Sequence, residues 1–593
     1  MKISKITIER YKSIRKLEVD FQDLMILVGE NNSGKTNILT ALELFFSSST
    51  RGVDDEYFYN KNKDKCIEIV ITFDRLTDDE KKSKLKKYII NDTLTIKKVC
   101  SWDPNDEKFK ARFYGLTHEP KEDYLKESKI KELSKQSGGL KKIVQDKGLP
   151  TYFHASSGNV TQKSYEEGLR RYISENYNDI EWDEPRYDEN NPLGYQQVLK
   201  DNLPEFLYVP AVRDITEESK ITTTTLFGKL INSILTKITE ENEQIKDIEI
   251  HIKEIKRRLD KPEKGDDDHR LEEIKAFEKY LTDMLQETMP TVSSVDLEIK
   301  PPGVKEIFQM GTKIRIDDGI PTYVESKGHG LQRSMIFTLF RAYAKYLRKH
   351  KGDAEEKIKK ERKPMIFAIE EPELYLHPQS QRVMFDVLKN ISQEDQVIFC
   401  THSTFFVDMG MYKSISIVKK GNLEKGSEIK QYIDDIFTDH VEKNEFKLLN
   451  EFDPERNELF FAKKVILVEG DKEKVVFPLV ARKMGIYNPE FTIVECAGKS
   501  NIPFFIKVLN AFEISYVVVH DVDPQKDTSK LNEVIKKCVD SSIGTIIPID
   551  PNFEVITIPE KSPFTAFKHF YDKTEDQIPT KLKNITKSIF NQI

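Results

Sequence analysis

The stretch LMILVGENNSGKT, from Leu24 to Thr36, joins an apolar run to a turn rich in glycine and asparagine. The apolar run predicts a buried strand, and the apolar spacing from Lys35 to Phe46 predicts a helix directly after the turn. The turn fits the pattern G-x-x-x-x-G-K-[ST], in which backbone N–H groups wrap phosphates and the lysine reaches the outer oxygens. The positive end of the following helix adds to this attraction. We therefore expect a nucleotide site formed by Gly29, Asn32, Ser33, Gly34, Lys35, Asn37 and, as a Mg²⁺ ligand, Thr36.

Further parts of such a site are predicted later in the chain. An apolar strand at residues 365–369 ends in Glu370 and Glu371. We expect the first carboxylate to hold Mg²⁺ through water and the second to polarise the attacking water. His402 ends the next apolar strand, where it is placed to sense the γ-phosphate. Glutamates or a histidine at strand ends are often structural, so these assignments depend on the phosphate loop.

A glycine turn followed by a helix offers a second phosphate-binding end. It lies before the helix predicted from Leu331 and contains Gly328, Gly330 and Gln332.

Acidic residues follow two apolar strands near the C-terminus. Glu469 ends one strand, with Glu473 on the next helical turn, and Asp521 and Asp523 follow the other strand. Alternate residues of a strand share a face, so Asp521 and Asp523 should point the same way. Four carboxylates arranged in this way predict a catalytic site for one or two Mg²⁺ ions, which stabilise the attacking and leaving oxygens of a phosphodiester.

The composition excludes several classes of protein. The chain has 593 residues, with 93 Lys and Arg against 100 Asp and Glu, and a net charge of -7. No run approaches the roughly 18 apolar residues of a membrane span, and no secretory signal is visible, so we expect a cytoplasmic protein without membrane contact. Five scattered cysteines exclude a disulfide scaffold. Since the average field repels phosphate, nucleic acid must be bound by a local basic surface or a metal ion.

The order of predicted elements divides the chain into several parts. Residues 1–212 and 291–445 contain the phosphate loop and its companion motifs, and a charged, poorly periodic stretch at about 116–205 is interpreted as an insertion. Residues 213–290 have long helical periodicity interrupted by a charged segment, which predicts a helical hairpin. Its apolar stripe favours a dimerisation arm over a solvated structural arm. Strands and helices alternate again from 446 to 593, which predicts a second α/β domain.

The order of motifs in the first part resembles the ATPase head of ABC-type proteins, of the split kind found in SMC-like proteins, over about residues 1–115 and 291–420. The resemblance implies that Gly328, Gly330 and Gln332 act in trans on the nucleotide of an opposing subunit. It therefore implies a homodimer or a higher homo-oligomer, such as a tetramer. The signature GHGLQ lacks an initial serine, which argues against fast, tightly coupled hydrolysis.

The acidic group resembles the Toprim domain of topoisomerases, primases and certain nucleases. An ABC-type head followed by a Toprim domain, with YVPAVRD at 208–214 and IEEPELYLHP at 369–378, resembles the overcoming lysogenization defect (OLD) family of nucleases, which includes the Gabija defence nuclease. In that family a glutamate at the position of Glu370 is usual. The resemblance further implies roles for the turn Gly498–Lys499, for Glu554 as a metal carboxylate, and for Lys561 as a catalytic cation beside the scissile phosphate.

The OLD resemblance implies an α/β protein with an ABC-type ATPase head, split by a helical dimerisation arm and followed by a C-terminal Toprim domain. It implies an ATP-regulated, divalent-metal-dependent DNA endonuclease of anti-phage defence, with ATP and Mg²⁺ in the head and Mg²⁺ or Mn²⁺ at the Toprim site. A helicase-like protein, or a retron reverse transcriptase with its nucleic acid, is a further expected partner. The rival interpretation is an SMC-like nucleotide-dependent DNA-binding or sensor protein that does not cleave. The sequence leaves open the DNA preference, the trigger and the sign of the ATP effect.

Overall fold

The computed structural model describes residues 1–47, 54–104, 108–155, 158–177, 179–189, 193, 198–199, 202–211, 243–259, 268–289, 291–297, 307, 313–328, 331–332, 334–335, 338–339, 342, 365–437, 439, 442–446, 455–524, 530–557 and 562–590. The chain forms two compact units. The first comprises Met1–Phe206, Lys363–Ala368 and Ser392–Ile593, and the second comprises Leu207–Arg362 and Ile369–Ile391. Among the described helices, none combines the length and apolar character of a membrane span.

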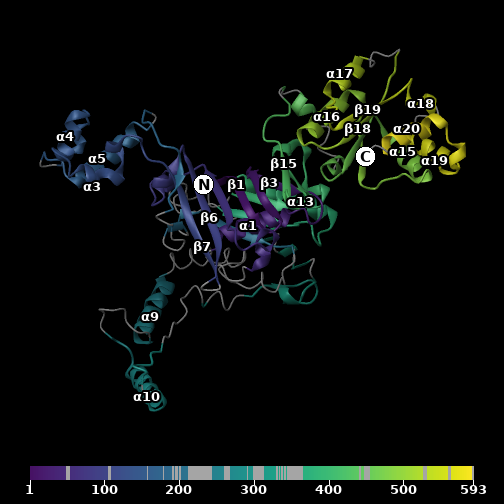
Figure 1. The fold of residues 1–593 in the computed structure, drawn as a ribbon. Helices are drawn as coiled ribbons and strands as arrows, with labels where there is room; N and C mark the ends of the chain where they lie inside the picture. The colour runs from purple at the N-terminus through teal and green to yellow at the C-terminus, as the bar shows by residue number, and fades with distance from the viewer. Residues whose placement is uncertain are drawn as a thin grey trace. The chain divides into compact units, whose positions relative to one another are not determined.

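The first unit begins with an antiparallel sheet that packs against helix α1 (Lys35–Phe46) (Figure 1). Alternating apolar residues bury one face of the sheet, and Phe45 of α1 contacts Phe73 and Phe113 on that face. The strand order is β2-β1-β4-β6-β7-β8, with β5 beside β6. The strands are β1 (Lys2–Tyr11), β2 (Ile14–Asp20), β4 (Ile67–Asp74), β5 (Ile89–Ile90), β6 (Thr93–Asp103), β7 (Lys108–Thr117) and β8 (Arg186–Tyr187). A short helix, α2 (Asp78–Lys81), follows β4.

A second, mainly parallel sheet carries the phosphate loop. Strand β3 (Leu24–Val28) is buried along its whole length and pairs in parallel with a strand on each side. Gln396 of the neighbouring strand exchanges two hydrogen bonds with the backbone of Ile3, which ties the two sheets together. The strand order is β15-β14-β3-β13-β12-β9. The other strands are β9 (Glu205–Val209), β12 (Met365–Glu370), β13 (Gln396–Cys400), β14 (Ile415–Lys420) and β15 (Ser427–Gln431).

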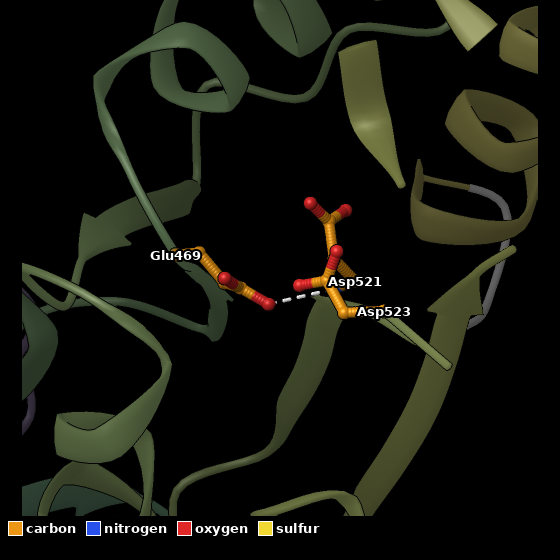
Figure 2. A group of neighbouring side chains, drawn as sticks. All are labelled: Glu469, Asp521 and Asp523. Carbon is orange, nitrogen blue, oxygen red and sulfur yellow. Dashed lines mark hydrogen bonds between the residues drawn. The ribbon is translucent and has the colours of Figure 1, made fainter. Parts of the chain in front are cut away.

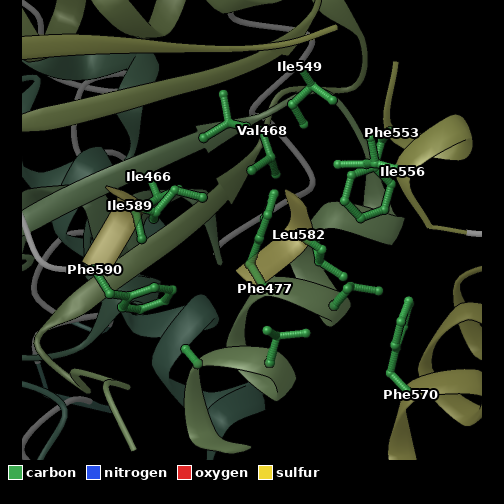
Figure 3. Close-up of a cluster of buried hydrophobic side chains, with 14 of the residues drawn as sticks. Ile466, Val468, Phe477, Ile549, Phe553, Ile556, Phe570, Leu582, Ile589 and Phe590 are labelled. Atoms are coloured by element: carbon green, nitrogen blue, oxygen red, sulfur yellow. The ribbon is translucent and has the colours of Figure 1, made fainter. Parts of the chain in front are cut away.

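The C-terminal part of the first unit is a parallel sheet with helices on both sides (Figure 1). Its strand order is β17-β16-β18-β19, and the core between the sheet and α15, α18, α19 and α20 contains Val468, Phe477, Phe553 and Leu582 (Figure 3). The strands are β16 (Lys464–Val468), β17 (Phe491–Glu495), β18 (Tyr516–Asp521) and β19 (Gly544–Ile549). The helices are α15 (Asp471–Lys483), α16 (Ile502–Ala511), α17 (Lys530–Cys538), α18 (Phe553–Ile556), α19 (Pro563–Tyr571) and α20 (Thr580–Phe590).

The stretch interpreted as an insertion contains a small helical module. Its helices are α3 (Ile130–Leu133), α4 (Gly139–Asp146) and α5 (Gln162–Glu175). They enclose an apolar core of their own that includes Leu133, Val144, Phe153, Tyr165 and Leu169. The charged and poorly periodic sequence of this stretch gave no indication of that core.

The second unit contains the described helices of the predicted arm, α9 (Glu243–Leu259) and α10 (Glu272–Thr288). Several large apolar side chains of these helices are exposed, among them Ile250, Tyr280 and Met284. Dimerisation through this arm stays a prediction. The remaining described elements are β10 (Arg315–Ile316), β11 (Thr322–Tyr323) and α13 (Pro378–Ser392), whose last residue is assigned to the first unit.

Candidate functional site

The phosphate loop lies between β3 and α1, and its two glycines are fixed by close packing. Gly29 has a φ of 143° and Gly34 a φ of 110°, conformations that side-chain-bearing residues rarely adopt. A Cβ atom at Gly29 would collide with the carbonyl oxygen of Val418, and one at Gly34 with the hydroxyl of Ser427. The loop therefore keeps its shape because its backbone lies directly against β14 and β15.

The side chains of this loop suit an anionic ligand. Lys35 is 5% exposed, and its Nζ donates hydrogen bonds to the carbonyl oxygens of Gly29 and Glu30 at 3.0 and 2.8 Å. Ser33 Oγ is buried and has no hydrogen-bond partner among the described residues. A phosphate oxygen would satisfy that hydroxyl and would attract the lysine.

Three other residues assigned to the loop have distinct positions. Thr36 is exposed at the start of α1, and Asn32 has a φ of 61° in the loop. Asn37 Nδ2 donates to Ser13 Oγ at 2.7 Å, so this side chain supports the loop from behind.

The turn after β13 is bound to the strand that leads into the phosphate loop. Thr401 is fully buried, and its N–H donates to the carbonyl oxygen of Leu27 at 3.1 Å. His402 follows it and is exposed. The turn that carries His402 is therefore anchored to β3 at Leu27, two residues before Gly29.

The other residues assigned to the nucleotide lie in the second unit. Glu370 is buried, and its Oε2 accepts a hydrogen bond from the Ala211 N–H at 3.0 Å. Glu371 follows it with a φ of 40°. Gln332 Nε2 donates to the carbonyl oxygen of Lys327 at 2.7 Å. Gly328 is described and accepts backbone hydrogen bonds at the start of the helical turn, whereas Gly330 lies outside the described residues.

Three of the predicted metal ligands lie together at the carboxyl ends of β16 and β18 (Figure 2). One carboxylate oxygen from each of Glu469, Asp521 and Asp523 lies within 4.8 Å of the others. The Asp521 N–H donates to Glu469 Oε1 at 2.6 Å, and the Phe553 N–H donates to Asp521 Oδ1 at 2.9 Å. Backbone groups therefore orient two of the three carboxylates.

Asp521 and Asp523 reach this group by a route different from simple strand alternation. Strand β18 ends at Asp521, and Asp523 has a φ of 47°. The Asp523 N–H donates to the carbonyl oxygen of Pro551 at 2.9 Å. The chain thus turns after the strand, and the turn is held by the segment that leads to α18. The alternation assumed from the sequence ends too early to explain the placement of Asp523.

Burial and mutual repulsion favour the protonated forms of two carboxyl groups. Burial, with repulsion from Glu469, raises the pKa of Asp521 to about 7. Burial, with repulsion from Asp521 and Glu469, raises the pKa of Glu473 to about 8. In the absence of a counter-charge, the site therefore holds protons at neutral pH. A divalent cation would displace them.

The remaining acidic candidates have other surroundings. Glu473 is 7% exposed near the start of α15 and lies outside the group of three. Glu554 forms an ion pair with Lys472. As a metal ligand, Glu554 would have to exchange this partner. Lys561 lies outside the described residues.

A buried lysine also belongs to the site. Lys499, in η13 (Lys499–Asn501), is 5% exposed, and its Nζ donates to the carbonyl oxygen of Asp521. The family resemblance drew attention to this turn, but the contact with the end of β18 depends on the fold. The Phe553 N–H was missed entirely, because a backbone donor carries no sequence signal.

Comparison with known families agrees with this geometry. Residues 1–407 match the family of the AAA ATPase domain, and residues 460–523 match the TOPRIM domain of overcoming lysogenization defect protein-like proteins. The predicted ATPase head with a C-terminal TOPRIM domain is thereby confirmed.

Similar proteins include three nucleases, two of which match along most of the chain. The Old nuclease of Escherichia phage P2 is 24% identical over 541 residues, which cover 88% of this chain and 77% of that protein. The endonuclease GajA of Bacillus cereus is 22% identical over 547 residues, with 89% and 76% covered. The OLD nuclease of Thermus scotoductus is 33% identical over 204 residues, which cover 33% of this chain and 35% of that protein. The chain therefore belongs to the AAA ATPase domain family, has an OLD-like TOPRIM domain after it, and is homologous to the Old nuclease and to GajA.

Proposed function

We propose that this protein is an ATP-regulated, divalent-metal-dependent DNA endonuclease and an effector of anti-phage defence. The observation that carries the proposal is the group formed by Glu469, Asp521 and Asp523 at one sheet edge. Three carboxylates repel the phosphates of DNA, so a domain that only bound DNA would gain nothing from collecting them. The relatives that match along most of the chain are nucleases by name, which supports the same activity here.

The donor set fits Mg²⁺ or Mn²⁺. Hard divalent cations prefer carboxylate oxygens, and the group offers one from each of three side chains. Bringing these side chains together raises the pKa of Asp521 to about 7, and a bound cation would relieve that repulsion. When bound, the metal would act as a Lewis acid on the phosphodiester and on a water molecule.

The protein's own contribution is to hold the oxygens in place. Glu469 is oriented by the Asp521 N–H, and Asp521 is oriented by the Phe553 N–H. Lys499 holds the end of β18 by donating a hydrogen bond to the Asp521 carbonyl oxygen. Glu473 holds a proton at neutral pH close to this group. We further propose that Glu554 is a metal ligand and that Lys561 is a cation beside the scissile phosphate.

ATP bound at the head is proposed to regulate cutting. Lys35 and Ser33 would hold the phosphates, and Thr36 and Glu370 the Mg²⁺ ion, while Glu371 would orient water and His402 would sense the γ-phosphate. The turn with Gly328, Gly330 and Gln332 would contact the nucleotide of an opposing subunit, so that two heads of a homo-oligomer would close around it. We expect saturating ATP to restrain DNA cleavage and hydrolysis to release it, because a ligand favours the assembly state that it binds better.

Plasmid cleavage tests the nuclease assignment. Supercoiled plasmid is incubated with Mn²⁺ or Mg²⁺ and the wild type, Glu469→Gln or Glu533→Gln. Glutamine keeps an acceptor for the Asp521 N–H but removes the charge, so Glu469→Gln should lose cleavage. Glu533 is exposed on α17 and lies outside the acidic group, so Glu533→Gln is the matched control and should cut like the wild type. Equal cleavage by wild type and Glu469→Gln would refute the assignment.

A further inference from the structure

A short 3-10 helix, η12 (Arg456–Phe460), connects the ATPase part and the TOPRIM part of the first unit. Asn457 is 5% exposed, and its Nδ2 donates to the carbonyl oxygens of Thr404 and Val407 at 3.2 and 2.7 Å. Both acceptors belong to the segment that directly follows His402. Asn457 therefore binds the segment that continues from the turn held by β3.

Arg456, the preceding residue, binds the nuclease sheet. Its Nε donates to the carbonyl oxygen of Glu495 and its Nη2 to Glu495 Oε2, both at 3.0 Å. The side chain of Arg456 is 9% exposed and that of Glu495 is 16% exposed. A buried guanidinium with two charge-assisted hydrogen bonds to one residue has a fixed geometry. Arg456 and the end of β17 should therefore move together.

Glu495 in turn holds the loop behind the metal ligands. Its Oε1 accepts a hydrogen bond from the Ala497 N–H, and the Gly498 N–H donates to the carbonyl oxygen of Glu469 at 2.8 Å. Ala497 has a φ of 56°, a conformation that needs support from its surroundings. These hydrogen bonds, together with the covalent links Arg456–Asn457 and Ala497–Gly498, thus connect the segment after His402 with the backbone of Glu469.

Two ion pairs between the same two parts have exposed side chains. Lys430 forms an ion pair with Glu513, with side chains 35% and 60% exposed. Lys463 lies 4.0 Å from Glu30, with side chains 52% and 61% exposed. Exposed ion pairs are screened by water and salt and tolerate movement of their side chains, so they pass little movement from one part to the other. The buried contacts of Arg456 and Asn457 differ from them in this respect.

We propose that Arg456 and Asn457 are a pair of positioning residues through which the nucleotide state of the head sets the metal affinity of the nuclease site. This inference rests on the proposed function, because it assumes that both ATP and a divalent metal bind. A shift of the segment after His402 would move Asn457, and Arg456 would pass the shift to Glu495 and to the Glu469 backbone. Neither side chain belongs to the group of metal ligands.

Mn²⁺ binding measured by electron paramagnetic resonance tests this pair without requiring cleavage. Free Mn²⁺ is titrated with and without a non-hydrolysable ATP analogue, and binding by Glu469→Gln is subtracted to isolate the nuclease site. In the wild type we expect the analogue to change the Mn²⁺ dissociation constant by at least about fivefold. In Asn457→Leu the change should fall below about twofold, with the affinity for the analogue retained. Lys430→Met removes an exposed contact and should respond like the wild type.

A second variant tests whether Asn457→Leu loses the response only because it is less well folded. Arg456→Lys keeps the charge but not the forked geometry, so it should also reduce the response while melting close to the wild type. A wild-type response retained in both folded variants would overturn the inference. So would a wild type that binds Mn²⁺ and cuts plasmid but ignores the analogue. A wild type that neither binds Mn²⁺ at this site nor cuts would instead refute the proposed function.

Discussion

The two regions proposed to handle phosphate differ in the charge that they present to it. The loop between β3 and α1 offers backbone N–H groups, Lys35 and no acidic residue in the first helical turn, so it attracts phosphate directly. The edge formed by β16 and β18 offers Glu469, Asp521 and Asp523, which repel phosphate until a cation binds. Occupancy of the first region should therefore follow nucleotide concentration, whereas the second should respond to metal and pH.

The largest expected effect that separates the two regions is that of Asp521→Asn, which should change DNA cleavage but not ATP binding. Asparagine is nearly isosteric but neutral, so the variant should lose DNA cleavage by about a thousandfold, comparable to losing a principal catalytic interaction. Its affinity for ATP should match the wild type, because the substitution lies outside the phosphate loop. Plasmid nicking and calorimetric titration with ATP measure the two properties. Cleavage at the wild-type rate would show that the acidic group is not the nuclease centre.

The converse substitution is Lys35→Ala. Removing the buried ammonium should weaken ATP binding by about a hundredfold, the value of a charge-assisted contact with phosphate. Mn²⁺ binding at the acidic group should persist in the absence of nucleotide. Glu371→Gln is a useful companion, since it should bind ATP normally but hydrolyse it slowly. Undiminished ATP affinity in Lys35→Ala would break the contrast between the two regions.

The pH dependence of metal binding should be confined to the acidic region. In the metal-free folded protein the pKa of Asp521 is about 7, above its ordinary value near 4. Because the folded state binds this proton more tightly than the unfolded state, Asp521 adds to the free energy of unfolding. This addition is full below about pH 4 and is lost as pH rises through about 7. Metal binding releases the same proton, so Mn²⁺ affinity should rise about tenfold per pH unit below pH 7. It should level off above about pH 8, where Glu473 is also ionised.

Calorimetric titrations with Mn²⁺ at several pH values measure this slope. Asp521→Asn, which has no carboxyl proton to lose at this position, should bind metal weakly and with a smaller slope. A flat profile in the wild type would mean that the protons are not displaced by the metal.

A smaller effect is expected from the segment that supports Asp521. The Asn552 side chain accepts the Val555 N–H at 3.1 Å and caps α18, whose first residue donates to Asp521. Losing an N-cap costs about 1 kcal/mol, so Asn552→Ala should weaken Mn²⁺ binding by no more than about fivefold. Asn552→Asp retains a capping oxygen and should lose less Mn²⁺ affinity than Asn552→Ala. Titration of both variants checks this order.

The two regions also differ in how far the sequence predicts them. The phosphate loop is contiguous, and Gly29, Gly34 and Lys35 are close in the chain, so one short pattern predicts both its residues and its flanking elements. The acidic group joins residues that are distant in the chain. Strand ends identified Glu469 and Asp521, but the turn that brings in Asp523 depends on Pro551, which no local pattern reveals.

The folded structure also determines which charged residues contact one another, and residue type alone does not predict these partners. Lys472 and Glu554 are far apart in sequence, and their ion pair competes with a metal role for Glu554. The Lys499 contact with β18 likewise joins separate elements. Such choices depend on the folded arrangement of side chains, so residue type and spacing could nominate these residues but not assign their partners.

The helical module inserted after β7 has a consequence for how such proteins diversify. The chain leaves the antiparallel sheet and returns to it at neighbouring positions, because Leu116 pairs with Tyr187 and Thr117 with Arg186. The module between these strands has its own apolar core. Because the cost of closing a loop grows slowly with its length, the segment can be lengthened, shortened or exchanged without changing the strand register. The module is therefore a place where the chain can gain, lose or replace residues without altering the sheet that supports the phosphate-loop helix.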